Sequence, residues 1–153
     1  MVVGVSACQG ASRESLAAGY TTLASAANAA SAPLLATLVS IEDTAARAPV
    51  LRGLADVEKT FADGLAALPT SGDVKAAADE VIRLAREREA AFRAAAQATG
   101  AAQAAALAPI LGEGGAAFHA AVERLRSVLG LPPTDASPTP GAARPGGGSV
   151  SRT

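Results

Sequence analysis

Aromatic and metal-ligating residues are scarce in this 153-residue chain, which has no tryptophan, one cysteine, one histidine and one methionine. A single cysteine excludes an intramolecular disulfide. One histidine and one cysteine are also too few for a metal site built from such ligands within one chain. With aromatic residues at 3% of the chain, single-stranded nucleic acid would find few rings on which to stack its bases.

An excess of positive charge is also lacking. The chain has 13 basic and 14 acidic residues, which gives a net charge of −1. Proteins that bind nucleic acid need a basic surface that displaces counterions from the phosphates. We therefore expect no nucleic-acid partner.

Motifs that carry catalysis are missing as well. There is no Gly-x-Ser-x-Gly nucleophile motif and no Gly-rich phosphate loop with a following lysine. The single histidine, His119, has Ala116 three residues before it, so the Glu-x-x-His motif of di-iron bundles is absent. We expect no catalytic residue, no cofactor and no metal, and interpret His119 as an ordinary surface or boundary residue.

Alanine dominates what is present, and apolar residues recur at helical spacing. Ser12 is placed to cap the first helical segment, and Pro33 predicts a kink or break near Ser31–Pro33. Apolar residues that recur every three or four positions lie on one face of a helix and form a stripe there. The stripe consists of Leu16, Tyr20, Leu23, Ala27, Ala30, Leu34, Leu38 and Ile41.

Three further segments show the same periodicity. The second extends from Leu51 to Leu68, with Pro49 in its first turn, and the third covers Asp73 to about Thr99. The fourth uses Leu107 to Leu129 and has a weak point at Gly112–Gly115, where a hinge would give two helices. Short connections between long helices predict an all-α, antiparallel four-helix bundle with up-down-up-down topology.

The composition divides the chain into three parts. Residues 12–131 form the predicted bundle, and residues 132–153 are rich in proline, glycine, serine and threonine with almost no apolar side chains. Such a segment buries too little surface to offset its ordering entropy, so a disordered tail is expected. Residues 1–11 precede the bundle and contain the only cysteine, Cys8.

The stretch Val5-Ser6-Ala7-Cys8 resembles the lipobox of bacterial lipoproteins, in which an aliphatic residue and two small residues precede a cysteine. The resemblance implies that a signal peptidase cuts before Cys8, which then carries lipid and becomes the mature N-terminus. Gln9–Ser12 would be the polar tether that follows. A signal peptide needs a charged start and 7–15 apolar residues, and Met1–Val5 is too short. We therefore expect translation to begin upstream of Met1. The alternative is an exposed thiol near a frayed terminus.

Two stretches contain no charged residue, one between Glu14 and Glu42 and the other between Arg93 and Glu113. Three explanations are open: burial in the bundle, which we favour, a partner or self-association surface, and a membrane span. Thr21, Asn28 and other polar residues lower the apolarity of the first stretch below that of a typical span.

These observations lead to two functional hypotheses. The first is a non-catalytic helical bundle of the cell envelope, anchored to the membrane through lipid on Cys8 and acting by protein interaction. The alternative is a soluble intracellular helical adaptor that self-associates through its uncharged faces. A ligand binder or enzyme that uses the bundle interior is a third, less favoured class, which a large interior pocket with converging polar groups would revive.

Overall fold

The chain folds into helices only, within residues 11–134, which are the part that the computed structural model describes. No strand occurs in this part of the chain. The elements are α1 (Arg13–Ser40), α2 (Ala48–Ala66), α3 (Gly72–Ala96), α4 (Gly100–Leu107), the 3-10 turn η1 (Ala108–Ile110) and α5 (Glu113–Leu129). The predicted all-α class is confirmed.

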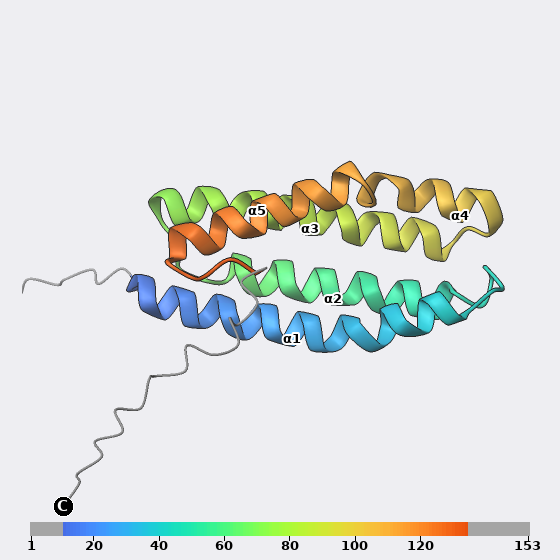
Figure 1. The fold of residues 1–153 in the computed structure, drawn as a ribbon, viewed down its shortest axis with the longest axis horizontal. Coiled ribbons are helices and arrows are strands. Elements are labelled where there is room, and N and C mark those ends of the chain that lie inside the picture. The colour runs from blue at the N-terminus through green and yellow to red at the C-terminus, as the bar shows by residue number, and fades with distance from the viewer. Residues whose placement is uncertain (1–10, 135–153) are drawn as a thin grey trace, which may run out of the picture.

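The helices form an antiparallel four-helix bundle in which the fourth position is shared by α4, η1 and α5. Figure 1 shows α1 and α2 as one antiparallel pair, with α3 returning beside α2 and the α4–α5 unit lying along α3. The most extensive packing joins α2 to α3, followed by α1 to α2 and α3 to α5. Contact between α1 and α5, which would close the bundle, is slight. The predicted up-down-up-down topology is confirmed, with one loosely closed side.

Local signals in the sequence account for the start of α1 and the end of α5. The backbone N–H of Ser15 donates to the Ser12 side-chain oxygen at 3.1 Å, which caps α1 as predicted. Gly130 ends α5 in the left-handed region at φ 76°. The N–H groups of Gly130 and Leu131 donate to the carbonyls of Ser127 and Arg126, which is the Schellman pattern.

The two expected weak points behave differently. The fourth segment does break before Gly112, which has φ +55°, so the predicted hinge is confirmed. By contrast, α1 passes through Pro33 as one continuous, bowed helix, so the expected break is wrong (Figure 1). Pro33 and Ala29 are both exposed, and water can therefore bond the Ala29 carbonyl that proline leaves without an intrahelical donor.

Buried side chains form two clusters. The larger one is centred on Tyr20, Leu65, Val81 and Leu125, and joins α1, α2, α3 and α5. The smaller one lies between α2, α3 and η1 and contains Leu51, Leu54, Phe92 and Ile110. A cavity borders both clusters.

One buried polar side chain ties the loops together at the end of the bundle. Gln103 is 1% exposed, and its amide nitrogen lies 3.0–3.1 Å from the carbonyl oxygens of Thr44, Ala95 and Ala98. The Thr44 hydroxyl accepts a further hydrogen bond from the N–H of Gly100. Gln103 therefore joins the α1–α2 connection to the turn between α3 and α4.

Candidate binding site

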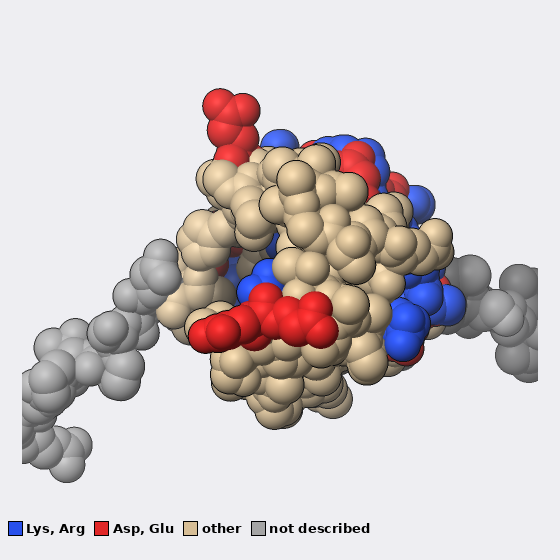
Figure 2. Space-filling model, turned by 90° about the vertical axis from the view of Figure 1, so that its right-hand side faces the viewer, with Lys and Arg blue, Asp and Glu red and all other residues tan. Residues whose placement is uncertain are grey.

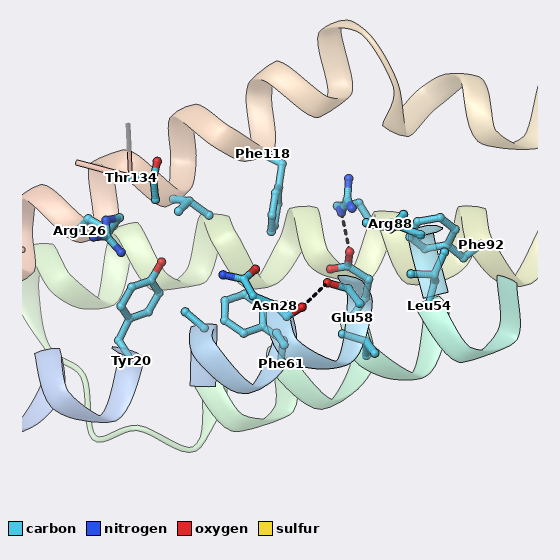
Figure 3. A pocket seen from close by; sticks show the side chains of 16 residues that line it. Tyr20, Asn28, Leu54, Glu58, Phe61, Arg88, Phe92, Phe118, Arg126 and Thr134 are labelled. Atoms are coloured by element: carbon cyan, nitrogen blue, oxygen red, sulfur yellow. Dashed lines mark hydrogen bonds and ion pairs between the residues drawn. The ribbon is translucent and has the colours of Figure 1, made fainter. Parts of the chain in front are cut away.

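A cavity of about 310 Å³ opens along the loosely closed side of the bundle, between α1 and α5. Its walls come from α1, α2, α3 and α5, and Figure 3 shows the labelled side chains around it. The chain has one tyrosine and three phenylalanines, and all four line this cavity. They are Tyr20, Phe61, Phe92 and Phe118.

An ion pair lies in the wall of this cavity. Arg88 Nε donates to Glu58 Oε1 at 2.7 Å, and the two side chains are 23% and 13% exposed (Figure 3). Burial raises the pKa of the Glu58 carboxyl above its usual range, and the neighbouring Arg88 partly offsets that effect. Such a pair contributes little to stability because both charges lose hydration.

The Arg88 guanidinium is held between two aromatic rings. Its central carbon lies 4.8 Å from the centroid of Phe118 and 5.6 Å from that of Phe92, which is cation–π distance. Nε is the only nitrogen of this group with a hydrogen-bond partner among residues 11–134. The Glu58–Arg88 pair is therefore fixed in orientation, while its remaining polar atoms have no hydrogen-bond partner among the described residues.

The other end of the cavity is bounded by Tyr20 and Arg126. Tyr20 meets Phe61 edge-on at a centroid distance of 6.5 Å. Burial raises the pKa of Tyr20, an effect that the Arg126 guanidinium opposes through a hydrogen bond and its charge. Arg126 Nε also donates to the Pro132 carbonyl at 2.8 Å.

The sequence holds a signal for Glu58 and Arg88 that our sequence analysis missed. Glu58 lies between Leu54 and Phe61 at spacings of four and three, which is a core position of α2. Arg88 is likewise four residues from both Leu84 and Phe92 on α3. Charged residues at core positions of two helices are candidates for an interior polar site.

The uncharged stretch of α1 is mostly exposed. Only Leu16 and Tyr20 of its 28 residues are buried, so the favoured explanation, burial, is wrong for this helix. Leu35 is 47% and Val39 86% exposed. A shallow groove of about 330 Å³ lies beside the helix, between Leu23 and neighbouring residues of α1 and Phe61 of α2.

The second uncharged stretch is also largely exposed. Of residues 94–112, only Ala95, Gln103 and Ile110 are buried. By length and apolar composition alone, Arg13–Ser40 and Gly100–Leu129 could each cross a membrane, which the core helix of a soluble protein can also do. Uncharged, solvent-facing helix surface is thus a general feature of this bundle.

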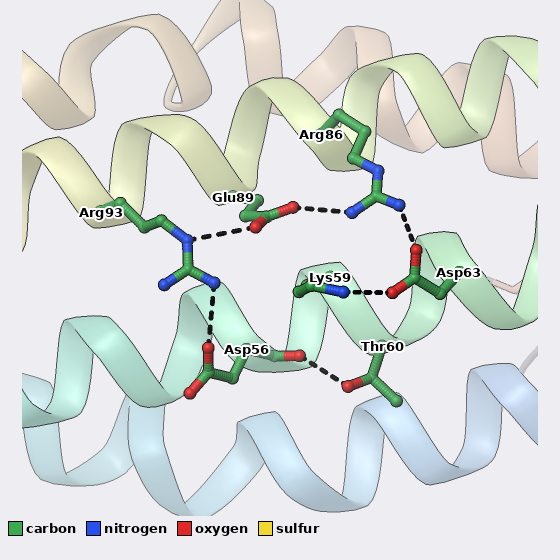
Figure 4. A network of polar contacts seen from close by, with 7 residues as sticks. All are labelled: Asp56, Lys59, Thr60, Asp63, Arg86, Glu89 and Arg93. Carbon is green, nitrogen blue, oxygen red and sulfur yellow. Dashed lines mark hydrogen bonds and ion pairs between the residues drawn. The ribbon is translucent and has the colours of Figure 1, made fainter.

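Charged side chains gather instead on α2 and α3. Figure 4 shows Arg93 bridging Glu89 and Asp56 at 3.1 Å each, and Arg86 bridging Glu89 and Asp63. Such exposed pairs contribute little stability individually. In the end view of Figure 2, the lower edge, which α1 forms, carries no lysine or arginine, whereas these residues gather toward one side and the top. The molecule therefore has a charged flank and an uncharged one.

The remaining candidate residues fall outside this site or outside the described chain. His119 is an exposed residue of α5. Within residues 11–134, no three His, Cys, Asp or Glu side chains are grouped so that they could hold a metal ion. Cys8 and most of the 132–153 tail lie outside the described residues.

Comparison with known proteins found no similar protein. No family model matches the chain, and neither a curated protein nor a solved structure does. The class of the protein is therefore defined by its architecture. It is an alanine-rich four-helix bundle with a cavity lined by aromatic residues and with an outer helix, α1, that has no charged residue after Glu14.

Proposed function

We propose that this protein is a non-catalytic binding protein of the cell envelope, anchored through lipid on Cys8, which presents α1 to a protein partner. The observation that carries the proposal is the surface of α1. Between Glu14 and Glu42 the helix has no charge, and only Leu16 and Tyr20 are buried.

The physical argument rests on desolvation. Charged residues are depleted from the core of protein interfaces, because moving a charge out of water costs free energy. An exposed face without charges avoids that cost when a partner covers it. The α1 face is long, since 28 residues at 1.5 Å per residue span about 42 Å.

The proposed anchor and this face are close in the chain. Arg13, the first residue of α1, is five positions after Cys8, and an extended chain spans at most about 3.6 Å per residue. Lipid on Cys8 would thus hold the start of α1 within about 18 Å of the anchored residue. Each buried CH₂ of an acyl chain contributes about 0.8 kcal/mol to membrane binding.

The anchor is tested by metabolic labelling with an alkyne fatty acid in cells that express the gene from its own locus. We expect label on the wild-type protein and its recovery with membranes, with both lost in Cys8→Ser. Ser12→Ala, which changes a nearby residue outside the lipobox-like stretch, serves as the control and should stay labelled. Unchanged labelling and fractionation of Cys8→Ser would contradict the anchor.

The binding face is tested with a photo-crosslinking amino acid placed at single exposed alanines in cells. Ala29 lies on α1 and Ala76 on the charged α3, and both are exposed. We expect one discrete crosslinked protein from position 29 and none from position 76. Equal crosslinking at both positions, or none at position 29, would contradict a role for the α1 face.

A second candidate, a soluble intracellular adaptor that self-associates, draws on the same uncharged face. Two copies related by a twofold axis would cover each other's α1 without burying charge. Size-exclusion chromatography with light scattering should then show a dimer that Ala29→Arg weakens and Ala76→Arg does not. A monomer at all concentrations counts against this candidate. Binding of α1 to a different protein would then be the remaining proposal.

A further inference from the structure

The cavity between α1 and α5 concentrates the bulky and polar side chains of an otherwise alanine-rich protein. All four aromatic residues border it, and three of the six lining residues of α1 are short, namely Ala24, Ala27 and Ser31. These short side chains lie between Tyr20 and Leu35 of the same helix, and the space beside them is about 310 Å³. This volume is at the lower end of the range for small-molecule sites.

The cavity is open to solvent on the side between α1 and α5, so it is a cleft and not a closed void in the core. Ala24 is only partly buried and faces the cavity, so a larger residue there would fill it. The chain instead keeps a small residue opposite Phe118 and Phe61.

The ion pair supplies the polar part of the cavity wall. Glu58 Oε1 accepts from Arg88 Nε at 2.7 Å. The other carboxylate oxygen and the two terminal guanidinium nitrogens have no hydrogen-bond partner among residues 11–134. Both side chains line the cavity, and the rings of Phe92 and Phe118 hold the guanidinium in place. One acceptor and two donors are thus presented together.

The charges of the wall select against a charged ligand. Glu58 and Arg88 neutralise each other, so a ligand charge beside them would lose hydration without meeting a net opposite charge. Arg126, the third charged residue of the wall, already donates to the Pro132 carbonyl. It lies eight residues from Phe118 on α5, which is about 12 Å along the helix.

From these observations we propose that the cavity binds a small, uncharged amphipathic molecule. A hydroxyl or primary amide group of the ligand donates to the second Glu58 oxygen and accepts from the Arg88 terminal nitrogens. The apolar part of the ligand lies among the aromatic rings. Binding at this site requires no lipid on Cys8.

Three probes of equal chain length separate the effects of shape and charge. Octanamide, octanoate and octylammonium are titrated into the full 153-residue chain, and binding is followed by two-dimensional amide NMR. We expect octanamide to shift cavity-lining resonances and to bind at least tenfold more tightly than either charged probe. Absence of octanamide binding, or tighter binding of either charged probe, would overturn the proposal.

Matched variants locate the site. Ala24→Leu fills the cavity from α1 and should weaken octanamide at least tenfold, whereas Ala29→Leu makes the same change on an exposed position and should leave affinity within twofold. Equal effects of the two changes would place binding elsewhere and overturn the proposal.

The polar part is tested separately with Glu58→Leu/Arg88→Met, which replaces the pair by apolar side chains of similar volume. Buried pairs replaced in this way usually leave a protein folded. We expect this variant to lose about tenfold in octanamide affinity while its helical circular dichroism is retained. Unchanged octanamide affinity in the folded variant would show that the pair is not the recognition element.

Discussion

Replacement of Gln103 by leucine removes the one polar side chain that is buried in the described part of the bundle. The side chains have similar volumes, so the change mainly affects hydrogen bonds. The amide nitrogen of Gln103 lies within 3.1 Å of the carbonyls of Thr44, Ala95 and Ala98, and can donate two hydrogens among them. Leucine leaves these acceptors without that donor.

The expected loss follows from two lost hydrogen bonds, each of which contributes about 0.5–1.5 kcal/mol. The Thr44 and Ala95 carbonyls still accept from the backbone N–H groups of Arg47 and Ala98, so they are not left unpaired. The Gln103 side-chain oxygen is buried without a partner, so its removal offsets part of the loss. We expect a net decrease of about 1–2 kcal/mol in the free energy of unfolding. For a domain of this size that lowers Tm by roughly 3–10 °C.

Urea unfolding followed by circular dichroism measures this change. Gln97→Leu is the matched control, because Gln97 is an exposed residue at the end of α3, and should change stability by less than about 0.5 kcal/mol. If Gln103→Leu were also within about 0.5 kcal/mol of the wild type, the structural role assigned to this amide would be refuted.

Two further predictions concern the hinge and the buried pair. Gly114→Ala should lower stability by about 1–3 kcal/mol, because its Cβ would lie 1.9 Å from the carbonyl oxygen of Pro109. Gly115→Ala, whose Cβ would be 3.4 Å from its nearest neighbour, should gain up to about 1 kcal/mol; equal Tm values in thermal unfolding would contradict this. Since burial raises the pKa of Glu58, the folded protein holds that proton more tightly than the unfolded chain, and the stabilisation from Glu58 is lost as pH rises through the folded pKa. As pH rises from about 3 to about 7, unfolding measurements should therefore show Glu58→Gln gaining stability relative to the wild type. Glu80→Gln should show the opposite trend, because Arg83 lowers the pKa of Glu80, and parallel trends would contradict both assignments.

The architecture could be predicted from the sequence because it depends on local patterns. Apolar spacing located the four segments, and Ser12 and Gly112 marked a helix start and a hinge that the structure confirms. Of the expected kink or break, Pro33 does not cause a break, because at an exposed position water can replace the missing hydrogen-bond donor. Periodicity reports where a helix has an apolar face, but not whether another helix covers it.

That distinction explains what the sequence did not reveal about the site. The α1 stripe continues through Leu34 and Leu38, yet both are only partly buried, because α5 contacts α1 over a short stretch. Glu58 and Arg88 are 30 residues apart, and only the packing of α2 against α3 brings them together. The cavity is lined by residues of four helices and lies where α1 and α5 are in slight contact, which is a property of tertiary packing.

The central proposal, an envelope bundle held by lipid on Cys8, is tested most directly by mass spectrometry of the protein purified from its native cells. The proposal predicts that the mature chain begins at Cys8 and that this residue carries a diacylglyceryl group. A peptide that continues through Ala7 into an unmodified Cys8 thiol would contradict it.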